Sequence, residues 1–489
     1  KSNKVAPLFG FGEKTEKNEI IFSSCLPRLG IIIPVCGEPV DEVRKSVFSA
    51  LAIHYPRELT CIIVTDDRGN PNLPALTREW SVSYETHPRH TESKAGNLNR
   101  ALAKLKAMGN PEWLLVLDSG DTITPDVMEH AIPYMTDAKI GFMQVERRLL
   151  FKDVELPADF RYFYEMILPR RDRFGSTFAC GSGAFWRTEA IDALGGFSTW
   201  NLVEDLTTSY FLQLRGWRGR YIYGKPFHFA DYVLDLPALV KQRWQWMIDT
   251  YRLFFWKNPF LQKTIPLVVK WDYAELGFSY LLSFPILILR LMPFVIIWWH
   301  HSLFYDNCFG LSYWHYFLPL MAARLLGEWI ALRHANVPFR NWKRQQTLFE
   351  GLMPVYCIAA MQTLMYGPDR KPRYHVTGKV QKNGFFAKTI RIQCAWFFGA
   401  IVTVWYGYYI GDGNVPMFFM SAFWLIYSSW LLMPFIICAA VTSSQIFYVL
   451  WKATVIGAFS SSICALLLGL WKMNAIKAIN CATGFNFNS

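Results

Sequence analysis

The chain has 489 residues, of which 52% are hydrophobic and 17% aromatic, while only 18% are charged. The charged share lies below the roughly 25% of ordinary soluble domains, so the composition excludes a disordered, collagen-like or purely soluble protein. The formal net charge is +12. In a chain this apolar, that charge indicates loops facing anionic lipid. No nucleic-acid partner is predicted, because neither a basic face nor a known binding module is visible.

The first half of the chain, from about Leu26 to Pro259, alternates short apolar runs with amphipathic stretches. We predict strands at Leu29–Val35, Thr60–Thr65, Val82–Thr86 and Trp113–Leu117. We predict helices at Glu42–Ile53 and over the stretch that carries Leu98, Leu102 and Leu105. In chain order the elements are strand, helix, strand, strand, helix and strand. This alternation favours a mostly parallel, doubly wound α/β sheet. Ligands of such sheets bind beyond the carboxyl ends of the strands.

Five apolar stretches in the second half each reach about the 20 residues that a membrane-spanning helix needs. They lie at Leu276–Trp299, Ser302–Ala331, Ile390–Ile410, Met417–Val441 and Ile446–Leu470. Arg290, Arg324 and Glu328 interrupt the first two, and we expect these charges to face protein or water rather than lipid. Lysine and arginine are concentrated in residues 333–346 and 370–388. The positive-inside rule therefore predicts that these segments and the α/β domain are cytoplasmic.

The segment Phe339–Met365 begins with basic residues and continues with apolar residues at helical spacing. We expect it to form a helix lying in the membrane interface rather than a span. An ordinary amphipathic core helix is the alternative.

Acidic residues follow two of the predicted strands. Asp66 and Asp67 end one strand, where a carboxylate can meet a uracil or ribose edge, although turns also use aspartate routinely. Asp118 and Asp121 follow the apolar run EWLLVL. Carboxylates there can hold Mg²⁺ or Mn²⁺, which prefer oxygen ligands and keep substrate phosphates in their shell. A structural turn is the alternative at this position.

Transfer of a sugar from a nucleotide needs groups that bind the base and a metal, a general base, and a cation for the leaving diphosphate. Two later motifs offer the general base and the cation. Glu204 and Asp205 form an acidic pair, and like charge or burial can tune one of them toward a general base; a helix N-terminal acid is the alternative. The run QRWQW, at 242–246, places a cation and two aromatic rings just before the apolar half. Guanidinium suits diphosphate and indole suits a sugar face, whereas an interfacial aromatic anchor is the alternative.

From about Leu29 to Val441 the chain resembles the membrane-integrated processive glycosyltransferases of family 2, the class of cellulose synthase and hyaluronan synthase. The matching segments are IIIPVCGEPVDEVRKSV, TDDRGN, SKAGNLNRAL, LVLDSGDTITPD, FACGSGAFWR, LGGF, VEDLTTS, QRWQW followed by KNPF, and YHVTGK. The last is similar to the family's gating loop, which closes over the nucleotide at the membrane face. The resemblance implies a GT-A-type doubly wound domain followed by a transmembrane helix bundle with amphipathic interface helices.

The resemblance implies a domain order and an activity. We expect an N-terminal segment (1–25), a cytoplasmic glycosyltransferase domain (26–262) and a transmembrane channel domain (263–489), with the interface helix and gating loop at about 339–388. The implied activity is inverting polymerisation of a UDP-sugar, chiefly UDP-glucose, into a β-glucan that crosses the membrane, with Mg²⁺ or Mn²⁺ as cofactor. The implied partners are the donor, the growing polysaccharide, the lipid bilayer and export or accessory subunits, in a multi-pass plasma (inner) membrane protein.

Individual roles also follow from the resemblance. It makes Asp205, with Glu204 beside it, the catalytic base, and Asp118, with Asp121, the metal site. It places the acceptor terminus at Cys180, Gly181, Ser182 and the platform Trp246. It assigns nucleotide-sugar contacts to Glu38, Asp66, Asp67, Lys94, Asp118, Gln242, Arg243, Gln245, Thr377 and Lys379.

Three departures from the family's motifs bear on these roles. Gly120 stands where the second acid of Asp-x-Asp belongs, so Asp121 would have to substitute from one position later. Gln245 stands where Gln-x-x-Arg-Trp has its arginine, so Arg243 or a gating-loop cation would have to neutralise the leaving diphosphate. Val203 replaces the threonine before Glu-Asp.

Three alternatives stay open at this point. The product could be another polysaccharide, hyaluronan-like or made of N-acetylhexosamine, and the departures would fit a product other than cellulose. A second alternative is transfer of one sugar to a lipid carrier. A third is a partner subunit that no longer catalyses. Even for a β-glucan, β-1,3, β-1,4 and mixed linkages all remain possible.

Overall fold

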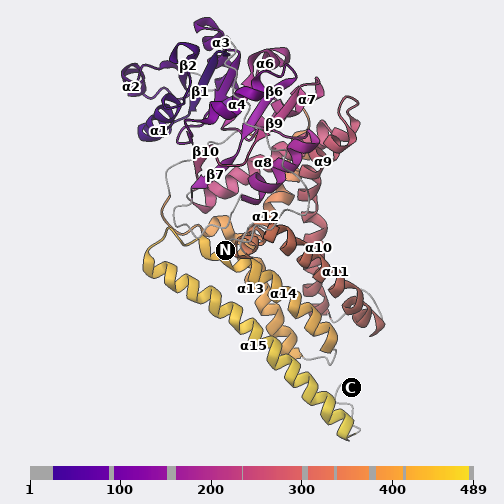
Figure 1. Cartoon of the computed structure of the whole chain (residues 1–489). Helices are drawn as coiled ribbons and strands as arrows, with labels where there is room; N and C mark the ends of the chain where they lie inside the picture. Colours follow the sequence, from indigo (N-terminus) through magenta and orange to yellow (C-terminus); the bar gives the residue numbers. More distant parts are fainter. Residues whose placement is uncertain are drawn as a thin grey trace, which may run out of the picture.

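A computed structural model of the chain places a sheet domain at one end and a set of long helices that extend away from it (Figure 1). The described residues are 26–86, 93–150, 161–233, 235–299, 307–334, 339–373, 382–410 and 415–483. Thr377 and Lys379, the candidate gating-loop contacts, lie outside these ranges.

The main sheet has seven strands in the order β3-β2-β1-β4-β8-β6-β9. Their bounds are β1 Leu29–Val35, β2 Thr60–Asp66, β3 Ser83–Thr86, β4 Trp113–Val116, β6 Ile140–Val145, β8 Ala184–Arg187 and β9 Arg218–Ile222. The first four strands in this order are parallel, whereas β8 runs antiparallel to both β4 and β6. The four predicted strands are confirmed, and so is the mostly parallel sheet, in which β8 alone runs against the other six strands.

Helices cover both faces of this sheet because successive strand side chains point to opposite sides. Ile31 and Ile33 of β1 pack with Val43 and Val47 of α1 in one core. Ile32 packs on the other face, with Leu98, Leu102 and Leu105 of α3. The helices are α1 Val40–Leu51, α2 Leu73–Glu79, α3 Ser93–Met108, α4 Val127–Met135, α5 Leu168–Phe174, α6 Thr188–Leu194 and α7 Asp205–Leu214.

A second, three-stranded sheet has the order β5-β10-β7. It is formed by β5 Thr122–Ile123, β10 His228–Asp231 and β7 Arg147–Leu150, with β10 parallel to β7 and antiparallel to β5. No sequence pattern predicted this sheet. It brings His228 and Arg147 close to the turn that follows β4.

Helix α8 (Leu236–Trp256) joins the sheet domain to the long helices. Asp235 caps its first turn by accepting the N–H of Ala238 at 2.8 Å, an interaction that typically stabilises a helix by about 1 kcal/mol. Its buried Met247 shares an apolar core with Leu352 of α12 and Phe435 of α14. The following helices are α9 Leu267–Leu281, α10 Ser283–Trp299, α11 Asn307–His334, α12 Phe339–Tyr366, α13 Ala387–Ile410, α14 Val415–Cys438 and α15 Gln445–Thr483.

Four helical stretches among the described residues are long and apolar enough to cross a membrane. They are Leu267–Trp299, Asn341–Tyr366, Phe418–Cys438 and Gln445–Lys472. Three correspond to predicted spans, but Asn341–Tyr366 falls in the segment predicted as an interface helix. The predicted span at 390–410 is a helix without meeting these criteria, and the one at 302–331 overlaps residues outside the described ranges.

The charge of Arg290 faces protein, as predicted. Its guanidinium in α10 pairs with the carboxylate of Glu350 in α12. Arg324 pairs with Glu328 of its own helix at 3.0 Å, and the Trp342 indole of α12 donates to Glu328 at 2.7 Å.

Candidate active site

A cavity of about 1460 Å³ begins at the carboxyl ends of β1, β2 and β4 and reaches helices α8, α9 and α12. Typical small-molecule pockets hold about 300–1,000 Å³, so this one has room for more than a nucleotide. The predicted residues that line it are Glu38, Asp67, Lys94, Asp118, Asp121, Cys180, Gly181, Asp205, Gln242, Arg243, Gln245 and Trp246. Asp66, Ser182 and Glu204 lie behind its wall.

The two aspartates that end β2 face different ways. Asp66 is 1% exposed, and its carboxylate accepts the N–H groups of Arg68 at 2.9 Å and Asn70 at 2.6 Å and the Tyr84 hydroxyl at 3.1 Å. Asp67 lines the cavity and pairs with the Arg100 guanidinium. Asp66 therefore shapes the turn, and Asp67 is the carboxylate of the pair that a ligand in the cavity can reach.

Lys94 is the cation at the centre of the carboxylate cluster. Its Nζ lies 2.7 Å from Asp118 Oδ1 and 3.2 Å from Glu204 Oε1, and it donates to the Gly181 carbonyl at 3.0 Å. Burial disfavours its charge, but the two carboxylates outweigh burial and raise the pKa of Lys94. The ammonium thus links α3, the turn after β4 and the start of α7.

Asp205 opens helix α7 beside this ammonium. Burial and the neighbouring Glu204 raise its pKa to about 7, although the Leu206 N–H, donated at 2.6 Å, and Lys94 favour the charged form. Gly181 has a φ of +84°, and a Cβ there would lie 3.2 Å from Asp205 Oδ2. A side chain at 181 would therefore crowd the carboxylate that faces the cavity.

The pKa of Asp205 predicts how activity depends on pH. If Asp205 is the base that the resemblance predicts, it must be deprotonated to accept a proton, and kcat should then rise with pH through an inflection near pH 7 instead of the ordinary range near pH 4. A pH profile of kcat at saturating donor measures this, and an inflection below pH 5 would contradict it. Because folding raises this pKa from 3.8 to about 7, the folded chain binds more protons between these values, and Asp205 makes the free energy of unfolding fall as pH rises from about 4 to 7.

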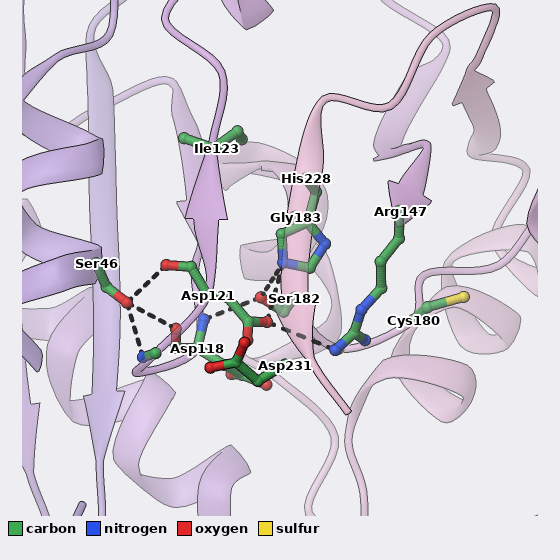
Figure 2. Close-up of polar contacts among 12 residues, drawn as sticks. Ser46, Asp118, Asp121, Ile123, Arg147, Cys180, Ser182, Gly183, His228 and Asp231 are labelled. Atoms are coloured by element: carbon green, nitrogen blue, oxygen red, sulfur yellow. Dashed lines mark hydrogen bonds and ion pairs between the residues drawn. The ribbon is translucent and has the colours of Figure 1, made fainter. Parts of the chain in front are cut away.

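The two aspartates of the turn after β4, Asp118 and Asp121, have different surroundings (Figure 2). Asp118 has a side chain 37% exposed beside Lys94. Asp121 is buried, and its Oδ2 lies 2.9 Å from His228 Nε2 and 3.6 Å from Arg147 Nη2. Burial lowers the pKa of His228, while its hydrogen bond with Asp121 opposes this. The Ser182 hydroxyl lies 3.1 Å from the same Nε2.

The residues around Asp118 fit a divalent cation held by one protein carboxylate. Mg²⁺ is commonly bound through one or two carboxylates together with substrate phosphates. Within the described ranges no three His, Cys, Asp or Glu side chains gather as a metal site, and Asp121 would have to give up its His228 contact to join. Asp118 would thus hold Mg²⁺ or Mn²⁺ together with the donor phosphates, and the role of Asp121 as second ligand stays a prediction.

The far half of the cavity is built by α8. The guanidinium of Arg243 lies 4.5 Å over the Trp246 ring, and the Trp244 indole points away, donating to Gln362 of α12 at 2.7 Å. Beyond them the wall continues with Tyr280 of α9 and Tyr356 of α12. Aromatic rings of this kind suit the faces of sugars.

Sequence reasoning did not predict Tyr280 or Tyr356, and it also missed two residues on the opposite part of the wall. Arg147 and Tyr164 line the cavity near Cys180, and each affects the other's ionisation. The Tyr164 phenol raises the pKa of Arg147, as does Asp121, against the effect of burial. The run VERRLL carries no recognisable motif, so only the pairing of β7 with β10 reveals that Arg147 reaches the site.

Comparison with known proteins finds a family model that matches part of the chain and several curated relatives. Residues 27–248 match the family described as "Glycosyltransferase like family 2". Cellulose synthase 1 of Komagataeibacter xylinus is 25% identical over 374 residues, which cover 74% of this chain and 23% of that protein. The UDP-forming cellulose synthase catalytic subunit of Xanthomonas axonopodis pv. citri is 26% identical over 266 residues, covering 52% and 36%. The chain thus matches less than half the length of these curated relatives.

Among solved structures, the mannosyltransferase PcManGT from Pyrobaculum calidifontis, in complex with GDP-Man and Mn²⁺, is similar with a TM-score of 0.50 and 18% identity. The similarity covers 70% of this chain and 88% of that one. At this identity it shows a shared fold, a GT-A-like mixed sheet domain.

Proposed function

We propose that the chain is a hexosyltransferase that polymerises UDP-glucose into a β-glucan, because residues 27–248 match the family described as "Glycosyltransferase like family 2" and most of the chain is similar to a cellulose synthase. The observation that carries the proposal is the cavity, which runs from Lys94 and Asp205 to Tyr280 and Tyr356 on the long helices. An enzyme that moves one sugar needs no such extension, whereas a growing glycan needs a path that starts beside the base.

In the proposed reaction Asp205 takes the proton of the acceptor's terminal hydroxyl. The freed oxygen bonds to the anomeric carbon of the donor as the bond from that carbon to the diphosphate oxygen breaks on the opposite face, so the configuration inverts. Lys94 keeps the carboxylates of Asp118 and Glu204 in place, and Trp246 supports the acceptor ring. A divalent ion held by Asp118 would supply positive charge for the departing diphosphate.

The proposal includes the placement of the enzyme in a membrane. Four helical stretches of the described residues are long and apolar enough to cross a membrane, and they support a membrane protein. We propose a catalytic domain at 26–262 on the cytoplasmic side and a channel domain at 263–489. In this proposal α12 lies in the membrane interface and does not cross, so that the basic segments 333–346 and 370–388 on either side of it are both cytoplasmic. The extended glycan would then leave through the helices, with any export subunits on the far side.

The test is product formation by the purified chain in nanodiscs. Radiolabelled UDP-glucose, UDP-N-acetylglucosamine and UDP-glucuronate are supplied separately with Mg²⁺ or Mn²⁺, and products are sized and digested with linkage-specific glucanases. High-molecular-weight glucan from UDP-glucose alone supports the proposal. Polymer from another donor overturns the β-glucan assignment, and a single transferred sugar overturns processivity.

The loss of activity on removal of the metal should be readily reversible. With one carboxylate beside the cavity as the main protein ligand, we expect EDTA to abolish transfer and added Mn²⁺ or Mg²⁺ to restore it at once, because Asp118 and the donor phosphates would hold the ion even while Asp121 keeps its contact with His228. UDP binding followed by calorimetry with and without metal measures this. Asp118→Asn should weaken the metal-dependent part of UDP binding by about tenfold or more, and equal UDP affinity with and without metal would contradict the assignment.

A further inference from the structure

The loop Thr199–Val203 leads directly into Glu204 and Asp205 and is held by helix α8. The two carboxylate oxygens of Asp249, which is 3% exposed, accept the N–H groups of Leu202 at 2.8 Å and Val203 at 2.7 Å. Burial raises the pKa of Asp249, while these two N–H groups and Arg252 favour its charged form, in which a carboxylate makes roughly twice as strong a hydrogen bond as a neutral acceptor. The backbone immediately before the base is therefore fixed by one side chain of α8.

Arg252 lies three residues further along α8 and holds the same loop. Its Nε donates to the Asn201 side chain at 3.0 Å, and its Nη2 donates to the carbonyls of Trp200 at 3.3 Å and Pro368 at 3.0 Å. Its Nη1 donates to the Gly367 carbonyl at 3.1 Å. This guanidinium thus joins the loop to the residues that follow α12.

Lys371 completes the attachment from that second side. Its Nζ donates to the carbonyls of Thr199 and, at 2.7 Å, Asn201. The side chain of Asn201 in turn donates to the Asp249 carbonyl at 3.2 Å. Every residue of the loop Thr199–Val203 is thereby hydrogen-bonded to α8 or to the segment after α12.

The same helix carries the acceptor wall. Gln242, Arg243, Gln245 and Trp246 line the cavity from α8, one to two turns before Asp249. A helix is a rigid element, so the distance between the acceptor wall and the base depends on the contacts that fasten the loop to it. By contrast, Glu204 at the N-cap of α7 gives that helix no side-chain cap, so the start of α7 is not held by a cap of its own.

We propose that Asp249 and Arg252 are positioning residues that place the Asp205 carboxylate relative to the acceptor wall on α8. The inference rests on the proposed function for its kinetic consequence, but its structural part stands apart from it. Neither residue belongs to the motifs that carry the family resemblance, because QRWQW ends at Trp246. A displacement of about 1 Å in a reacting group can cost about 100-fold in rate, so the loop has to be held closely.

The test uses Asp249→Ala, Arg252→Ala and the double variant of the full chain in nanodiscs. We expect kcat to fall by about 10- to 100-fold in each, with the KM for the UDP-sugar and the stoichiometry of UDP binding unchanged. The losses should not add in the double variant, because both act through one loop. Asp235→Ala is the matched control: it removes a buried aspartate from the same helix, outside the cavity, and should lower thermal stability without changing kcat per UDP-binding site.

Hydrogen exchange separates this inference from the proposed function. The amides of Leu202 and Val203 should exchange faster in Asp249→Ala and remain protected in Asp235→Ala. Protected amides in Asp249→Ala, or fast exchange with an unchanged kcat, would overturn the positioning role. If the wild-type chain transfers no sugar from any donor, the proposed function fails, and the exchange result alone then decides whether Asp249 holds the loop.

Discussion

Replacing Asp205 by asparagine is expected to lower kcat for sugar transfer by about 10²- to 10⁴-fold, the range that a positioned general base contributes. Asparagine has nearly the same shape and can still accept the Leu206 N–H, which Asp205 accepts at 2.6 Å. The change therefore removes the proton acceptor and leaves the loop and the cavity in place. Single-turnover transfer from labelled UDP-sugar measures the loss, and calorimetry should show UDP binding retained.

Asp192→Asn is the control for this prediction. Asp192 is an exposed carboxylate that pairs with Lys106 at the surface, and its loss should leave kcat unchanged. If kcat of Asp205→Asn lies within about threefold of the wild-type value, Asp205 does not make the contribution of about 10²- to 10⁴-fold that is expected of a general base. Glu204 would then be the remaining carboxylate of the pair.

Replacing Lys94 by methionine is expected to have the largest effect on stability. Its ammonium faces Asp118 at 2.7 Å and Glu204 at 3.2 Å, and Glu204 is 2% exposed. Removing one partner of a buried ion pair typically costs about 3–5 kcal/mol, because the other charge is left uncompensated. Chemical denaturation of the nanodisc-embedded chain, followed by the fluorescence of its tryptophans, should show this loss.

The Lys94 variant should also change the pH profile. Because Lys94 favours the charged form of Asp205, its removal should move the inflection in kcat above pH 7. Lys106→Met is the matched control on the same helix, since Lys106 pairs with Asp192 at the surface, and exposed pairs contribute about 0–1 kcal/mol. Equal stability losses in the two variants would contradict the central role of Lys94.

The elements that the sequence predicted well are those whose side chains repeat with a regular period. Leu29–Val35 is a continuous apolar run and forms a strand buried along its whole length. Leu98, Leu102 and Leu105 recur at helical spacing and face the sheet from α3. Burial of each such side chain stabilises the fold by about 1.5–3 kcal/mol, so the pattern and the structure agree.

For two of the long helices, hydropathy alone does not decide whether the helix spans the membrane or lies at its interface. The segment 339–365 begins with basic residues and was predicted to lie in the interface, yet Asn341–Tyr366 is a continuous helix long enough to span. The stretch 390–410 is a helix that does not meet the same criteria. Both carry polar or aromatic residues that lower their hydropathy, so length and composition place them near the boundary between the two classes.

In the site, too, the sequence predicts the type of residue but not what each residue contacts. Asp66 and Asp67 are adjacent and chemically identical. The carboxylate of Asp66 accepts three hydrogen bonds, whereas Asp67 lines the cavity. The sequence proposed Asp121 as a metal ligand because it replaces a missing acid one position later. In the structure its Oδ2 lies 2.9 Å from His228, a residue more than 100 positions away.

The sequence alone determined the α/β class, the apolar half and the identity of the acidic and cationic motifs, because these depend on local period and residue type. The tertiary structure alone decided which of these residues meet. Lys94 touches Asp118, Gly181 and Glu204, which lie on three separate segments, and β7 reaches the site only by pairing with β10. Periodicity specifies the face that an element buries, whereas contacts between distant segments depend on strand order and helix packing, which no local pattern encodes.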